Sequence, residues 1–202
     1  MYKSSISLND FAEEIQNELE LSPFVSTSSI VRIVNSVEQL LYSEIINEIR
    51  KADVDVTDGR ASLSGIEVSE GEDTVNAYDV IRVFDDRREL AFATSDDAYV
   101  MNKKGAFGIF DGDSLSLYGV DADRITVFYK VRPVPKSVEY DKITPDVLNV
   151  PEKFTEMFAS RLRGEFCKIA GDDGQAAKWL NDYNTYLEDF RIFASKRAGV
   201  DV

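Results

Sequence analysis

The hydrophobic period of this chain changes twice along its length, and this change limits the possible folds more than any other feature. Apolar residues recur every three or four positions up to about residue 51, which predicts amphipathic helices. From about residue 52 to 141 they alternate with polar residues, which predicts short strands. Helical spacing then returns. We therefore expect an α+β fold, a helical bundle into which an antiparallel β-rich segment is inserted.

The expected bundle has two helices before the β-rich segment and a helical hairpin after it. Their predicted ranges are about 8–21, from the Ser/Thr-rich stretch 26–29 to 51, 151–171, and from the turn 172–174 to 197. The apolar arcs of the second and last helices are too wide for one neighbour, which predicts packing on two sides. We expect one domain over residues 1–202, with a helical part of residues 1–51 and 142–202 and a β insert of residues 52–141.

Seven runs in the insert alternate like strands and are bounded by turn residues. They are residues 61–68, 79–84, 88–94, 98–102, 106–110, 114–118 and 124–132. In the last run Ile125, Val127, Tyr129 and Val131 share one face, which predicts that this face is buried. Phe128 lies on the opposite face, where we expect it to be partly covered.

The residue types that many enzymes need are missing from the chain. It has no histidine, which excludes Ser-His-Asp and Cys-His sites, and its single cysteine, Cys167, excludes an intramolecular disulfide and a cysteine zinc site. Neither a GxxxxGK[ST] phosphate loop nor a GxGxxG motif is present. A formal net charge of −14 argues against nonspecific binding to nucleic acid or to an anionic membrane. The sequence therefore predicts a protein that is not an enzyme and holds no cofactor or metal.

Most of the negative charge is concentrated in two short regions. Residues 1–20 carry five acids and one base, and residues 52–79 carry eight acids and one base, so these regions hold −11 of the −14 charges. Seven acids of the second region are candidates for a functional surface: Asp53, Asp55, Asp58, Glu67, Glu70, Glu72 and Asp73. Three interpretations remain open: a solvated acidic face, a surface that repels DNA, and a docking site for a basic partner.

Large aromatic residues recur at helical spacing along the last predicted helix. They are Trp179, Tyr183, Tyr186, Phe190 and Phe193. Such a stripe is typical of a packed core or of an interface with another subunit or partner. We expect Trp179, Tyr186 and Phe193 to lie between this helix and a neighbouring helix, within one subunit or between subunits.

The C-terminal part of the chain carries a succession of soft motifs. These are the strand 124–132 with Pro133, the link 142–151, a helix with Phe154, Leu162 and Phe166, the turn 171–173, and a helix with Ala176, Ala177, Trp179, Tyr183 and Leu187. In this order the motifs resemble the head-to-tail connector, or portal adaptor, proteins of tailed bacteriophages, including the tail tubular protein A type of short-tailed phages. The resemblance is best over about 75 residues from Arg124, whereas the first 50 residues match only as helices.

The resemblance implies a non-enzymatic virion protein of the neck or tail that is assembled in the host cytoplasm. Proteins of this family typically form a ring of twelve copies, a dodecamer, beneath the portal protein. The ring extends the DNA channel and offers a platform to the next tail or ring protein. Double-stranded DNA would pass through it without specific binding, and no membrane would be contacted. The acids of residues 53–73 would then line the channel and keep the DNA from adhering, or would dock a partner.

Three other functions remain open at this point. One is another neck or tail component, such as a tail terminator, that assembles by the same chemistry. The second is an enzyme that uses carboxylates and a divalent cation, for example a muramidase-like tail accessory protein. The third is a cytosolic interaction module. The mass of the assembled protein distinguishes a ring from a lone enzyme or interaction module.

Overall fold

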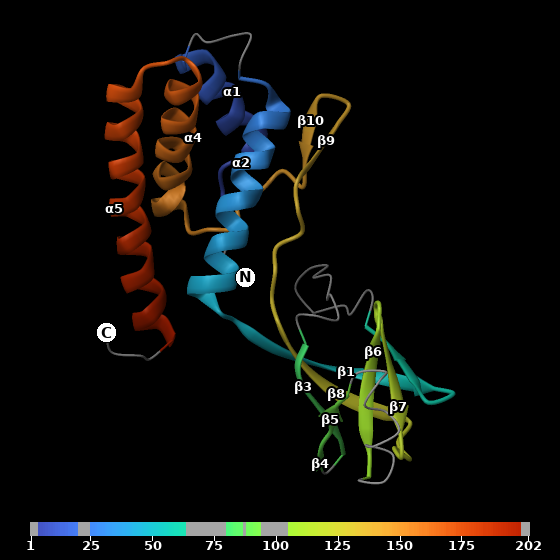
Figure 1. Cartoon of the computed structure of the whole chain (residues 1–202). Coiled ribbons are helices and arrows are strands. Elements are labelled where there is room, and N and C mark those ends of the chain that lie inside the picture. Colours follow the sequence, from blue (N-terminus) through green and yellow to red (C-terminus); the bar gives the residue numbers. More distant parts are fainter. Residues whose placement is uncertain (1–3, 20–24, 64–79, 87, 94–104, 199–202) are drawn as a thin grey trace. The chain divides into compact units, whose positions relative to one another are not determined.

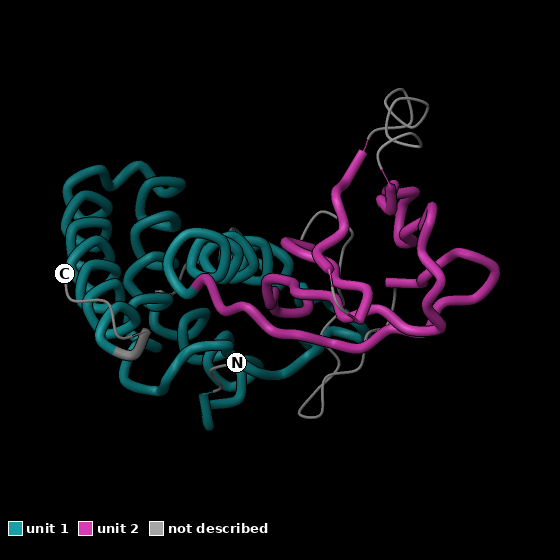
Figure 2. Tube along the Cα trace, turned by 90° about the horizontal axis from the view of Figure 1, so that it is seen from below, with its two compact units in different colours: residues 1–46, 135–202 teal, residues 47–134 magenta. Residues whose placement is uncertain are grey.

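The computed structural model divides into two compact units that are formed by different parts of the chain (Figure 2). The helical unit comprises residues 1–46 and 135–202, and the sheet unit comprises residues 47–134. The helical unit is thus built from two separate stretches of chain, and the sheet unit from one. The residues that the structure describes are 4–19, 25–63, 80–86, 88–93 and 105–198.

Among the described residues, the helical unit contains four α-helices, two shorter helical turns and a two-stranded hairpin (Figure 1). Their bounds are α1 Leu8–Leu19, α2 Thr27–Leu40, the π-helical turn η1 Leu41–Ile46, β9 Ser137–Glu139, β10 Lys142–Thr144, the 3-10 turn η3 Glu152–Phe154, α4 Thr155–Ile169 and α5 Asp173–Ala198. The core lies between the helices, and the hairpin packs with β9 against α2 and with β10 against α1.

Helix α2 begins and ends at residues with recognisable roles. The Ser26 hydroxyl accepts a hydrogen bond from the Ser29 amide at 3.2 Å, which caps the first turn. Ile30 and Val34 follow one face and are fully buried. The continuation of α2 through η1 ends at Ile46, because Asn47 adopts a left-handed conformation with φ 49°. The predicted extension of this helix to residue 51 is therefore wrong.

Helices α4 and α5 form an antiparallel hairpin (Figure 1). One glycine ends α4, and a second allows the two helices to approach closely. Gly171 ends α4 with φ 81°, and the Asp172 carboxylate accepts a hydrogen bond from the Gln175 amide at 3.0 Å. At Gly164 the helices approach closely, since a Cβ atom there would lie 2.8 Å from the Leu180 side chain. The predicted helical hairpin is confirmed in this part of the chain.

The sheet unit contains eight described strands in one mixed sheet, with the order β4-β3-β8-β1-β2-β7-β6-β5. The strands are β1 Ile49–Thr57, β2 Arg60–Ser62, β3 Val80–Asp85, β4 Arg88–Glu89, β5 Ala91–Phe92, β6 Phe107–Asp111, β7 Ser114–Tyr118 and β8 Arg124–Lys130. Strand β8 is central and pairs antiparallel with both β1 and β3. Strands β5 and β6 are parallel, with Ala91 opposite Phe107.

The two ends of this sheet are joined by a very short piece of chain. Strands β4 and β5 lie at opposite ends of the strand order, yet only Leu90 separates them in the sequence. Leu90 is 2% exposed, and its amide donates a hydrogen bond to the Val83 carbonyl at 2.8 Å. The chain therefore bends the sheet until its two edges meet at one residue, which places the side chains of one face in a shared core.

The fold class predicted from the sequence is wrong. Four α-helices and an eight-stranded mixed sheet are present among the described residues, rather than a helical bundle with an inserted antiparallel segment. Strand β1 was missed because Ile49 continues the helical apolar spacing of the preceding residues, although the run from Ala52 to Val56 alternates between apolar and acidic residues. The hairpin β9–β10 was missed because its strands have three residues each, too few to show a period.

Other strand predictions can be compared directly with the structure. The predicted run 114–118 coincides with β7, and the predicted run 124–132 exceeds β8 by two residues. Ile125, Val127, Tyr129 and Val131 are all buried, which confirms the predicted inward face. Phe128 is half-buried and contacts Phe84 edge to face at 5.5 Å between ring centroids. The predicted run 98–102 lies outside the described residues.

Candidate functional site

The predicted aromatic stripe of α5 separates into two groups in the structure. Tyr183 and Phe190 are 6% and 0% exposed and belong to the core of the helical unit. Phe190 meets Phe154 edge to face, with 4.9 Å between ring centroids. Burial raises the pKa of Tyr183. These two residues therefore stabilise the unit from within.

Trp179, Tyr186 and Phe193 form the second group and are half-buried. Phe193 packs against Phe154 at 5.3 Å between centroids. Trp179 faces the guanidinium carbon of Arg163, which lies 4.8 Å from the ring centroid. Part of each ring is thus covered within the chain, and the remainder is open to contact from outside.

Arg163 connects three helices at this end of the unit. Arg163 lies on α4. Its guanidinium pairs with Glu18 of α1 at 2.7 Å and with Glu156 of α4, and it faces the ring of Trp179 on α5. Burial lowers the pKa of Arg163, but the hydrogen bonds that Arg163 donates to Glu18 and Glu156 outweigh this effect and raise it. The contact orients the indole ring, so the exposed part of Trp179 has a defined position.

Three of the seven predicted acids lie among the described residues, all in the sheet unit. Asp55 accepts a hydrogen bond from the Arg124 side chain at 2.8 Å, and Asp53 accepts one from the Thr126 hydroxyl at 2.7 Å. Asp58 occupies the turn between β1 and β2 with φ 51°. All three are exposed. The other four acids, Glu67, Glu70, Glu72 and Asp73, lie outside the described residues.

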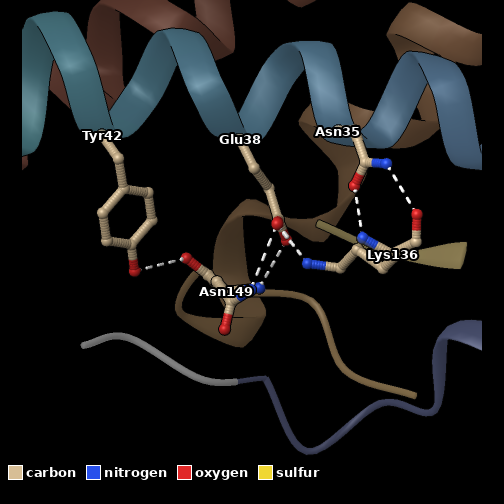
Figure 3. Close-up of polar contacts among 5 residues, drawn as sticks. All are labelled: Asn35, Glu38, Tyr42, Lys136 and Asn149. Carbon is tan, nitrogen blue, oxygen red and sulfur yellow. Dashed lines mark hydrogen bonds and ion pairs between the residues drawn. The ribbon is translucent and has the colours of Figure 1, made fainter. Parts of the chain in front are cut away.

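A buried polar cluster attaches the segment that follows the sheet unit to α2 (Figure 3). Glu38 and Lys136, which are 1% and 0% exposed in their side chains, form an ion pair. Glu38 also accepts hydrogen bonds from the Asn149 amide at 2.8 Å and from its side chain at 3.1 Å. The Tyr42 hydroxyl donates to the Asn149 carbonyl at 3.1 Å. The charge of Glu38 is therefore compensated at both carboxylate oxygens.

Asn35 adds a second attachment to the same segment. Its side chain accepts a hydrogen bond from the Lys136 amide at 2.8 Å and donates one to the Lys136 carbonyl at 2.9 Å, as a neighbouring strand would. Burial lowers the pKa of Lys136, and the Glu38 carboxylate opposes that shift. Both charges are satisfied within the cluster, so its role is to hold residues 136–149 on α2.

Sequence reasoning did not find this cluster, although one signal was present. Glu38 occupies a position between Val34, Val37 and Leu41 on the apolar face of α2. An acid on a buried helix face requires a cationic or hydrogen-bonding partner. The partner, Lys136, is distant in the sequence, and no local pattern identifies it.

A groove with a volume of about 640 Å³ lies between α1 and the hairpin β9–β10. Its rim carries four carboxylates and one ammonium group: Asp10, Glu13, Asp141, Asp146 and Lys142. Asn9 joins the two walls, because its side chain accepts from the Ile143 amide at 2.8 Å and donates to the Ile143 carbonyl at 3.1 Å. The groove is therefore built by specific contacts.

Asp146 holds the second wall of the groove at the start of α1. Its carboxylate accepts hydrogen bonds from the Asn9 amide at 2.8 Å and from the Ser7 hydroxyl at 2.9 Å. Partial burial raises the pKa of Asp146, but the hydrogen bonds from Asn9 and Ser7 outweigh that effect and lower it. The Asp146 carboxylate stays ionised at neutral pH. Its negative charge then interacts favourably with the positive N-terminal end of the α1 helix dipole.

Across the described residues, no cluster of three or more acids or cysteines is arranged to hold a metal ion. No helix in the same part of the chain has the length and apolar character to cross a membrane. Comparison with protein-family models finds no match for the chain, and comparison with curated protein sequences finds none either.

Proposed function

We propose that this chain is a structural subunit of a bacteriophage virion, a head-to-tail connector that assembles with copies of itself beneath the portal. The observation that carries the proposal is the arrangement of the chain. A helical unit is formed from residues 1–46 and 135–202, and a sheet unit of residues 47–134 is inserted between η1 and β9. This order of elements supports the resemblance in the C-terminal motifs, although the sheet is larger than predicted.

The helical unit also exposes apolar side chains that a partner subunit could cover. Ile169 at the end of α4 is 54% exposed, and Ile192 on α5 is 39% exposed. Tyr186 is half-buried on the same helix. Such side chains contribute to association when a neighbouring surface removes them from water. They support an assembly role for exposed positions of the α4–α5 hairpin.

In this proposal the partners are further copies of the chain, the portal protein and the next tail or ring protein, and the site of action is the virion neck. Asp53 and Asp55 are exposed, so they would add negative charge wherever the sheet unit faces DNA. Because Asp55 is paired with the Arg124 guanidinium, its repulsion of phosphates would be reduced at short range.

Native mass spectrometry tests the proposal directly. Twelve copies of a 22.7 kDa chain make about 272 kDa, and we expect a ring of this order for the chain alone or after mixing with the portal protein from the same genome. A chain that stays at 22.7 kDa in both samples contradicts the proposal. A monomer that cleaves peptidoglycan in the presence of Mg²⁺ would instead favour the carboxylate enzyme.

A variant with Tyr186→Ser and Ile192→Ser tests the α5 surface. We expect the ring to dissociate while the midpoint of urea unfolding of the monomer changes little, because both side chains are at least partly exposed. The matched control is Ile81→Ser, since Ile81 is 37% exposed but lies in the sheet unit. If both variants assemble normally, α5 is not the interface.

A further inference from the structure

The hairpin β9–β10 presents one aromatic side chain to solvent without covering any part of it. Tyr140 at the tip of the hairpin is 100% exposed. It and Asp141 occupy the two turn positions with φ 50° and 62°, values that glycine, asparagine and aspartate adopt more readily than tyrosine. Tyrosine side chains that become buried on association are frequent contributors to binding energy.

Tyr140 directly precedes the residues that line the groove between the hairpin and α1. Asp141 and Lys142 line one wall, and Asp10 and Glu13 line the other. Among the described residues, the carboxylates of Asp10, Glu13 and Asp141 have no hydrogen-bond or ion-pair partner. The groove therefore offers acceptors that are free to bind a donor from another molecule.

The walls of the groove are attached to the core of the helical unit. Asn9 pairs with Ile143, which is 1% exposed, and the buried Glu38–Lys136 pair fixes the start of β9 on α2 (Figure 3). A ligand would not need to order these walls, so less of its binding energy is lost to conformational entropy.

The net charge of the groove indicates which class of ligand it attracts. With four carboxylates and one ammonium group, the groove carries a formal charge of 4 × −1 + 1 = −3. A second copy of a chain with net charge −14 would on average be repelled, whereas a cationic segment would be attracted. Lysine and arginine stems also pack well on an exposed tyrosine ring.

We infer that the groove between α1 and the hairpin β9–β10 docks an extended, lysine- or arginine-bearing segment of another protein, with Tyr140 as the aromatic anchor. This inference does not rest on the connector function. It concerns one surface of the helical unit and would hold for any assembly that supplies a basic segment.

The test uses the full chain and a short peptide in which lysine alternates with alanine, with a glutamate–alanine peptide as the negative control. We expect calorimetry to show binding of the lysine peptide that weakens with added salt. Hydrogen exchange should slow at residues 137–146. Asp10→Asn combined with Glu13→Gln should weaken binding about fivefold to tenfold, and Tyr140→Ser should also weaken it while Tyr140→Phe does not.

The matched control is Asp189→Asn combined with Glu44→Gln, which changes the net charge by the same amount at exposed positions of the helical unit. Equal loss of affinity in the two double variants means general attraction between opposite charges and overturns the inference. Absence of lysine-peptide binding overturns it as well. Dissociation of a self-assembled form by the groove variants, without peptide, would assign the groove to a second copy. If the unsubstituted chain binds the lysine peptide but forms no ring, only the connector function is contradicted.

Discussion

The two units use charged side chains in opposite ways. In the helical unit, Glu38 and Lys136 are 1% and 0% exposed and pair with each other, and Glu38 also accepts a hydrogen bond from the backbone amide of Asn149. In the sheet unit, Asp55 and Arg124 pair at 2.8 Å across neighbouring strands, but their side chains are 75% and 64% exposed. A buried pair is expensive to break because a lone charge remains in the core, whereas water and salt screen an exposed pair. Breaking the buried pair should therefore cost the helical unit more stability than breaking the exposed pair costs the sheet unit.

The largest effect should come from breaking the buried pair. Glu38→Gln leaves the Lys136 ammonium without its counter-charge, so we expect the free energy of unfolding to fall by about 3–5 kcal/mol. Urea unfolding should measure the loss of stability, and hydrogen exchange should show that it is confined to the helical unit. Glu44→Gln, at an exposed position of η1, is the control and should change the stability by less than about 0.5 kcal/mol. A small effect of Glu38→Gln would show that the two units do not differ in this way.

The corresponding change in the sheet unit removes an apolar side chain. Leu90→Ala should lower the free energy of unfolding by about 2–4 kcal/mol, because Leu90 is 2% exposed and joins the two edges of the sheet. Exchange should accelerate in strands β3 and β6 while the helical unit keeps its protection. Ile81→Ala, at a side chain that is 37% exposed, should have a much smaller effect. Equal losses from the two substitutions would contradict the importance of the closure.

A smaller effect is expected where helices α4 and α5 approach each other. A Cβ atom at Gly164 would lie 2.8 Å from Leu180, so Gly164→Ala should destabilise the helical unit by about 1–2 kcal/mol. Gly174→Ala is a matched control, because the nearest atom to its Cβ atom would be 3.7 Å away. The control should be neutral or slightly stabilising in thermal unfolding, since alanine favours the helix.

The exposed pair of the sheet unit should contribute least at neutral pH. The hydrogen bond and charge of Asp55 raise the pKa of Arg124, but the pair is open to solvent. We expect Asp55→Asn to leave the urea midpoint within experimental scatter at physiological salt. A clear loss of stability would show that exposed charges also hold the sheet together.

A further small effect concerns pH and the helical unit. The pKa of Asp146 is lowered in the folded state, so its contribution to stability is present above the ordinary aspartate pKa and is lost as the pH falls through the folded value. Asp146→Asn should thus be slightly less stable than the unsubstituted chain at neutral pH and equally stable in acid. Urea midpoints measured from about pH 7 to pH 3 check this difference. A difference that grows toward low pH would contradict the sign.

The agreement between prediction and structure follows the range of the interactions involved. Helix α5 and strand β7 were located well, because their apolar period and their turn residues are local signals. Strand β1 was missed, because Asn47 ends the preceding helix by a backbone conformation that its neighbours do not reveal. The aromatic stripe was found, but the sequence could not show that Tyr183 and Phe190 face the core while Tyr186 remains partly open.

The groove illustrates the same limit for the candidate site. Asn9 and Ile143 are 134 positions apart and form a reciprocal pair, and Glu38 and Lys136 are 98 positions apart. Each of these residues is ordinary in its own segment. These residues form their contacts only when the segment after the sheet unit packs against α1 and α2.

The amino-acid sequence alone located helix α5 and strand β7, the concentration of negative charge and the residues that face inward on β8, since each depends on neighbours along the chain. The tertiary structure decided the strand order, the closure at Leu90 and the pairing of Glu38 with Lys136. Those features depend on which distant segments exclude water together, and burial, unlike periodicity, is a property of the assembled core.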